Sequence, residues 1–235
     1  MNTIREFASY FSKQHTTEEA LKLEAQFAAN KYSGSHQNPP IIEVVGRRSV
    51  VISCPHAVNH PRENRLKLAD TFTGALGLQL AEFTGASLLV YARTTEEDPN
   101  FDKAGPYKTH ILGLIARVQP SFVIDLHGLG RSQRPELVIG TSQGATLGHN
   151  LALRDLLVQI MNRNRFTNIA TDIPGFYDAS RSTTIAAHVW REVKIPSLQL
   201  EIHKNFRDPV EMPENYNRML NSLAQFIETS VQISQ

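Results

Sequence analysis

Residues 121–128 read Ser121-Phe122-Val123-Ile124-Asp125-Leu126-His127-Gly128. The apolar run over 121–126 predicts a buried strand, and Asp125 and His127 arrive where this strand ends. Gly128 permits the sharp turn that takes the chain away from a strand end. Open α/β sheets bind their ligands at the carboxyl ends of strands, so this stretch predicts both a sheet and a functional site at its edge.

Two other segments have the same design. The apolar run over 49–54 leads into Pro55 and His56, and a predicted strand over 197–202 carries Glu201 and ends before His203. Glu201 stands between apolar neighbours, where a carboxylate is costly unless it is paired or functional. Together the three strand ends predict one shared site.

Strands alternate with helices along most of the chain. We predict helices over 66–84, 107–118, 147–164 and 213–231, and strands over 41–45, 49–52, 86–92, 121–126, 136–139, 168–171 and 197–202. This alternation is typical of an α/β fold with a mixed, mainly parallel sheet flanked by helices on both faces. The expectation of a mixed sheet comes from the first two strands, which a tight connection over 46–48 joins.

The first forty residues differ in pattern from the rest. Helical patterns over 3–13 and from Thr16 onward precede a loop of Ser, Gly, His, Asn and Pro over 33–40. Such a loop marks a break between elements. We therefore expect residues 1–40 to form a helical lead-in packed on a catalytic α/β domain over 41–235.

Composition narrows the class of protein. The 235 residues carry a formal net charge of +1, and no basic run suggests a nucleic-acid partner. A single cysteine, Cys54, excludes an internal disulfide and fits a reducing compartment. Beside His56 it is an alternative nucleophile, although a free cysteine usually behaves as a small buried hydrophobe. No apolar run reaches the length of a membrane span, so we expect a soluble, cytoplasmic protein without a membrane partner.

The residue types at the strand ends predict a metal site. Two histidines and a carboxylate are the usual protein ligands of a hydrolytic zinc ion, with a fourth position left for water. His56 and His127 are the candidate histidines, and either Glu63 or Asp70 could supply the carboxylate. An aspartate two residues before a ligand histidine, as Asp125 is, can orient the imidazole.

Five short motifs follow one another along the chain: Cys54-Pro55-His56-Ala57, Asp98-Pro99-Asn100, Ile124-Asp125-Leu126-His127-Gly128, Ile139-Gly140-Thr141 and Gln199-Leu200-Glu201-Ile202. In this order they resemble the N-formylglutamate amidohydrolase family, which is related in fold to the zinc carboxypeptidases (phosphorylase/hydrolase-like). The resemblance implies a zinc ion held by His56, Glu63 and His127. It also implies that Glu201 is the base, taking a proton from the attacking water and giving it to the departing amine.

The middle motif departs from the family pattern. Deformylases of the family show Asp-x-Asn-Arg, whose asparagine and arginine hold the substrate carboxylate, whereas Phe101 follows Asn100 here. Arginine is the natural bidentate partner of a carboxylate. Asn100 stays a candidate substrate contact, and Arg62 and Arg191 are the first candidates to replace the missing arginine. Further candidates for substrate contacts are Arg131, Arg181, Lys103, His60 and His203.

These observations predict a zinc-dependent amidohydrolase. Its expected substrate is a small N-acyl amino acid, including an N-formyl one, or a peptide-like molecule. One alternative is a carboxypeptidase-like peptide hydrolase or an esterase, which would use the same site to cleave a different bond. An alternative of another class is a non-catalytic binding or assembly protein derived from the same fold. The sequence leaves the oligomeric state open.

Overall fold

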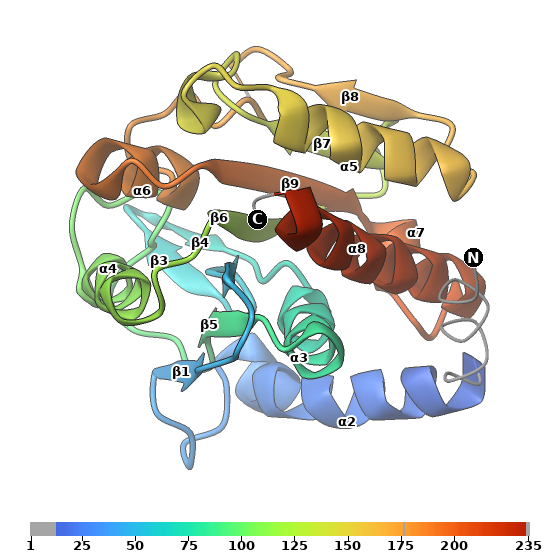
Figure 1. Cartoon of the computed structure of the whole chain (residues 1–235). Helices are drawn as coiled ribbons and strands as arrows, with labels where there is room; N and C mark the ends of the chain where they lie inside the picture. The colour runs from blue at the N-terminus through green and yellow to red at the C-terminus, as the bar shows by residue number, and fades with distance from the viewer. Residues whose placement is uncertain (1–12, 176, 234–235) are drawn as a thin grey trace.

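The computed structural model describes residues 13–175 and 177–233. Within them, one sheet has the strand order β1-β5-β2-β6-β9-β7-β8 (Figure 1). The central strands β5, β2, β6 and β9 are parallel, whereas β1 and β7 pair antiparallel with β5 and β9. The predicted mixed, mainly parallel sheet is therefore confirmed. The strands are β1 (Ile41–Val44), β2 (Val50–Cys54), β5 (Ser87–Tyr91), β6 (Phe122–Leu129), β7 (Leu137–Gly140), β8 (Ile169–Thr171) and β9 (Ser197–His203).

The connection between the first two strands is tight, but these strands are not neighbours, because β5 lies between β1 and β2. The chain at 46–48 crosses the amino-terminal end of β5, where the Gly46 N–H donates to Ser87 Oγ (3.0 Å) and the Arg48 N–H to the Gly85 carbonyl (2.8 Å). A side chain at position 46 would overlap the backbone of Gly85 and Ala86. The glycine therefore allows the crossing.

Helices cover both faces of the sheet (Figure 1). On one face α2 (Lys13–Tyr32) packs on α3 (Thr73–Thr84), and both contact α8 (Pro213–Ile233), which also packs on α5 (Ala152–Arg163). On the other face α4 (Pro106–Val118) packs against α6 (Ile185–Val193). Ala20 and Phe27 place α2 in the same apolar core as the sheet. The division of the chain at residue 40 stays a prediction.

The order of the strands determines where a site can form. From β2 the chain crosses through α3 to β5 on one side, then returns through α4 to β6 on the other side of β2. Right-handed crossovers in opposite directions place their helices on opposite faces of the sheet. The carboxyl ends of β2 and β6 therefore border the crevice where an open α/β sheet binds its ligands.

Several local predictions differ from the structure. The helix predicted over 66–84 begins only at Thr73, because a two-stranded hairpin of β3 (His60–Arg62) and β4 (Arg65–Lys67) precedes it. The helix predicted over 147–164 begins at Ala152, after the 3-10 turn η1 (Ala145–Leu147). Two helices, α6 and the short α7 (Lys204–Arg207), were not predicted. The helix predicted over 3–13 lies almost wholly outside the described residues.

Within the described ranges, every helix is too short or too polar to cross a bilayer.

Candidate metal centre

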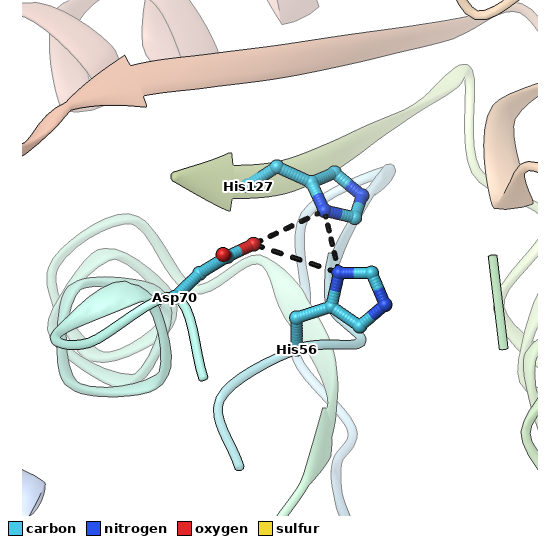
Figure 2. Close-up of side chains that lie close together, drawn as sticks. All are labelled: His56, Asp70 and His127. Carbon is cyan, nitrogen blue, oxygen red and sulfur yellow. Dashed lines mark hydrogen bonds and ion pairs between the residues drawn. The ribbon is translucent and has the colours of Figure 1, made fainter. Parts of the chain in front are cut away.

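Three buried side chains meet near the carboxyl ends of β2 and β6 (Figure 2). His56 follows β2, His127 lies near the end of β6, and Asp70 stands just before α3. The two histidine Nδ1 atoms are 3.1 Å apart, and each lies 3.5 Å from Asp70 Oδ2. Ligand atoms around a tetrahedral zinc ion are separated by about 3.3 Å, given zinc–ligand bonds of about 2.0 Å. The triangle of donor atoms therefore fits such an ion without rearrangement.

Each histidine is oriented by a carboxylate on its other ring nitrogen. His56 Nε2 lies 3.0 Å from Asp98 Oδ1, and His127 Nε2 lies 2.9 Å from Asp125 Oδ2. With Nε2–H donating to these carboxylates, the Nδ1 lone pairs of both rings point at the shared centre. Histidines that bind metals in proteins almost always have such a partner, which sets the tautomer and the ring orientation.

The aspartates are themselves held in place. Asp98 Oδ2 accepts a hydrogen bond from Arg62 Nε (2.7 Å), and Asp125 Oδ1 accepts one from Ser53 Oγ (2.8 Å). Lys67 Nζ donates to Asp70 Oδ1 (2.7 Å), which leaves Oδ2 as the oxygen that faces the histidines. Every member of the triangle therefore has a partner that restricts its orientation.

The carboxylate beside the two histidines is Asp70, not Glu63. Glu63 is exposed at the turn between β3 and β4, where its backbone has φ 54°. The hairpin moves Glu63 away from the sheet and brings the chain back at Asp70, whose N–H donates to the His56 carbonyl (2.8 Å). The expected ligand Glu63 thus lies away from the two histidines, and the alternative carboxylate, Asp70, lies beside them.

The pKa values within the triangle reflect its charges. Burial lowers the pKa of His127, but Asp125 and Asp70 outweigh this effect, and the net shift is well above the usual value. Burial raises the pKa of Asp70, yet Lys67 and the two histidines hold it well below its usual range. A proton on His127 Nδ1 accounts for the contact between the two Nδ1 atoms, because one of them must donate.

Glu201 lies next to this centre. It is the register partner of His127 in the parallel pair β6–β9, so both side chains project from the same face of the sheet. The residue is 8% exposed, and Gln199 Nε2 donates to its Oε1 (3.0 Å). Burial raises the pKa of Glu201, and the nearby His127 opposes this effect only in part. A carboxylate with a raised pKa beside a metal site is suited to accept and return a proton.

Two of the predicted substrate contacts lie at the site. Asn100 Nδ2 is 3.0 Å from His127 Nε2, and Asn100 Oδ1 accepts the Ile185 N–H at the start of α6. Arg62 bonds Asp98 and stacks over the Phe101 ring at 5.4 Å. The guanidinium group of Arg62 thus lies over Phe101. Phe101 follows Asn100, at the position where the family pattern has arginine.

The other predicted contacts have different surroundings. His60 is fully buried and its Nδ1 donates to the Glu97 carbonyl (2.8 Å). Arg191 is exposed on α6 and bonds the Ser182 carbonyl and the side chains of His188 and Glu192. His203 accepts the Asn205 N–H at the start of α7. Arg131, Arg181 and Lys103 are exposed.

Cys54 does not have the environment of a nucleophile. Its side chain is fully buried, and its thiol donates to the Thr73 carbonyl of α3. Burial raises the pKa of the thiol well above its usual value, and nearby carboxylates raise it further. Reactive cysteines have lowered pKa values and partial exposure. The alternative of a cysteine nucleophile is therefore not supported.

Sequence reasoning missed two residues of the centre. Asp98 stood in a recognised motif, but no role was assigned to it, although an aspartate in a loop after a central strand is a candidate partner for a nearby ligand histidine. Lys67 gave no signal, because it lies in a segment predicted as a helix and its contact with Asp70 depends on the hairpin.

Comparisons with known proteins show which folds this chain shares. No protein-family model matches the sequence, and no curated protein matches it either. Among solved structures, N-formylglutamate amidohydrolase from Ralstonia eutropha JMP134 is similar with a TM-score of 0.59 and 17% identity, over 83% of this chain and 97% of that one. A bacteriophage poly-gamma-glutamate hydrolase has a TM-score of 0.50 and 16% identity, over 85% and 91% of the two chains. The zinc-free apo form of YNDL has a TM-score of 0.52 and 13% identity, over 83% and 93%. The resemblance found in the sequence is thus confirmed at the level of the fold.

Proposed function

We propose that this protein is a zinc-dependent hydrolase that cleaves an amide bond of a small N-acyl amino acid or a peptide-like substrate. The observation that carries the proposal is the triangle of His56, Asp70 and His127 with the buried carboxylate of Glu201 beside it. Zinc matches the donor set of two imidazoles and one carboxylate. A zinc ion held there would supply Lewis-acid polarisation of the carbonyl and activation of water.

The chain's own residues have separate roles in this proposal. Asp98 and Asp125 keep the two imidazoles in the tautomer that presents Nδ1, and Lys67 keeps Asp70 turned toward them. Glu201 takes a proton from the attacking water and returns it to the departing nitrogen. Because burial already raises its pKa, the protonated form costs less than it would on a solvated glutamate.

The substrate class rests on two considerations. Two structural neighbours are named for glutamate-containing substrates, N-formylglutamate and poly-gamma-glutamate, and both names describe hydrolysis of an amide. Arg62 and Lys67 are cations beside the metal ligands, and either would attract a substrate carboxylate. We therefore infer an amide substrate that carries a carboxylate, with N-formyl, N-acetyl and γ-glutamyl compounds as the first candidates.

The test combines metal analysis with turnover. The purified protein should contain about one zinc ion per chain, and it should hydrolyse at least one member of a panel of N-acyl amino acids and γ-glutamyl peptides. Glu201→Gln should keep the zinc ion and lower kcat by about 10²–10⁴-fold, the usual contribution of a general base. Glu43→Gln, at an exposed glutamate on the edge strand β1, is the control and should leave both unchanged.

The alternatives have different outcomes in the same test. If the protein cleaved only peptides or only esters, the proposed site would still hold. The protein would then be a peptide hydrolase or an esterase. Zinc binding without any turnover would favour a binding protein. Full activity of Glu201→Gln would reject the proposed base, and a wild-type protein with no affinity for zinc would reject the proposal as a whole.

A further inference from the structure

Arg207 is a buried arginine at the end of α7, directly after the strand that carries Glu201. Only 5% of the residue is exposed. Its guanidinium group donates through three different nitrogens: Nε to the Ile202 carbonyl (3.2 Å), Nη2 to the Leu129 carbonyl (3.3 Å), and Nη1 to the carbonyl and hydroxyl of Thr71. One side chain therefore joins three segments that are far apart in the sequence.

Each of these segments carries a residue of the candidate centre. Thr71 follows Asp70, Ile202 follows Glu201, and Leu129 lies two residues after His127. All but the bond to the Thr71 hydroxyl go to backbone carbonyls, so they constrain where the chain runs rather than how a single side chain turns. One planar guanidinium group thus holds the backbone beside three residues of the proposed site. These are His127 on β6, Asp70 before α3 and the proposed base, Glu201, on β9.

Gly128 lets the guanidinium group approach the strand. A Cβ at position 128 would lie 2.6 Å from Arg207 Cζ and 2.6 Å from its Nε. Asp70, Glu201 and Glu24 all interact favourably with the charge of Arg207. The buried cation is therefore compensated by the carbonyl oxygens that accept its N–H groups and by the charges of nearby carboxylates.

We propose that Arg207 is a positioning residue that sets the spacing between Asp70, His127 and Glu201. This inference rests on the proposed function, since it gives a role to the same centre. Only arginine offers several N–H donors in a rigid, planar arrangement, whereas lysine has a single compact ammonium group. Displacements of about 1 Å at a catalytic site can lower turnover by about 10²-fold, so the distances among the three segments matter.

The test compares Arg207→Met and Arg207→Lys with the wild-type protein. Zinc affinity is measured by competition with a chromogenic chelator, and ligand geometry by the visible spectrum of the Co²⁺-substituted protein. Arg207→Met should weaken zinc binding by about 10–100-fold, the range for residues that orient metal ligands, and should change the Co²⁺ bands. Arg207→Lys should be intermediate, and kcat should fall more than KM rises in both.

Arg218→Met is the matched control. Arg218 bonds the Arg165 carbonyl and the Asn215 side chain and stacks over the rings of Phe166 and Phe206, so these partners lie outside the three segments. Its loss should lower the free energy of unfolding and leave the Co²⁺ spectrum and the zinc affinity unchanged. If Arg207→Met does not fold, Arg207→Lys and Gly128→Ala provide the comparison, and Gly128→Ala should shift the Co²⁺ bands.

The outcomes separate this inference from the proposed function. Zinc affinity and Co²⁺ spectra in the Arg207 variants that match those of Arg218→Met would refute the positioning role alone. A wild-type protein that binds neither Zn²⁺ nor Co²⁺ would refute the proposed function, and the positioning role with it.

Discussion

Asp70 and Glu63 are two acidic residues of one short segment with opposite environments. Asp70 is buried against both histidines, whereas Glu63 is exposed at a turn. Asp70→Asn should therefore weaken zinc binding by at least about 10²-fold, because a buried metal ligand loses its charge. Glu63→Gln should have no effect. Titration of the metal-free proteins with zinc measures both, and the reverse pattern would restore Glu63 as the ligand.

The same pair of residues shows what the sequence could and could not predict about the site. His56, His127 and Glu201 lie on or just after strands with clear apolar patterns, so their convergence followed from sheet geometry alone. The choice of carboxylate depended on the hairpin over 60–67. That hairpin has no recognisable pattern, since Leu66 is 56% exposed while Lys67 turns inward to Asp70. Its side chains contradict the rule that apolar residues face the core.

Among the elements, α3 packs very closely on the sheet. Gly77 faces the Cys54 sulfur, and a Cβ there would overlap that atom. Gly77→Ala should lower the free energy of unfolding by about 1–3 kcal/mol, the usual cost of overpacking a core, despite the better helix propensity of alanine.

Gly113→Ala on α4 is the matched comparison, because its added Cβ would meet only the end of Arg117 at 3.6 Å. This substitution should raise the free energy of unfolding by about 0.5–1 kcal/mol through helix propensity. Urea denaturation of the metal-free proteins measures both values. Equal effects of the two substitutions would mean that α3 packs no more tightly than α4.

Elements were predictable where their patterns were strong. The central strands and the helices over 107–118 and 213–231 have apolar residues at regular spacing, and the structure contains an element at each place. In contrast, α6 was not predicted: besides its local cap, where Thr184 Oγ1 accepts the Ala187 N–H, its first turn meets the loop after β5, where Asn100 accepts the Ile185 N–H. Such a tertiary contact leaves no trace in local spacing.

At the scale of the whole molecule, a buried glutamate links α2 to the rest of the fold. Glu24 is 4% exposed and accepts the Phe72 N–H before α3 at 2.7 Å. Burial raises its pKa from 4.5 to about 7. The folded protein therefore holds this proton more tightly than the unfolded chain, so the resulting stability is fully present below about pH 4.5 and is lost as the pH rises through about 7.

The upward shift of the Glu24 pKa from 4.5 to about 7 corresponds to roughly 3 kcal/mol. Glu24→Gln should remove this part of the pH dependence, so the difference in unfolding free energy between wild type and variant should change between about pH 4.5 and about pH 7. Chemical denaturation across this range measures the difference. Glu82→Gln, at an exposed glutamate on α3, is the control. A difference that stays constant with pH would show that Glu24 does not titrate in this window.

The surroundings of His127 have a consequence for metal uptake. Because Asp125 and Asp70 raise the pKa of His127, a proton and a metal ion would compete for its Nδ1. Under the proposed function, the fraction of molecules that carry metal would then depend on local acidity as well as on metal supply.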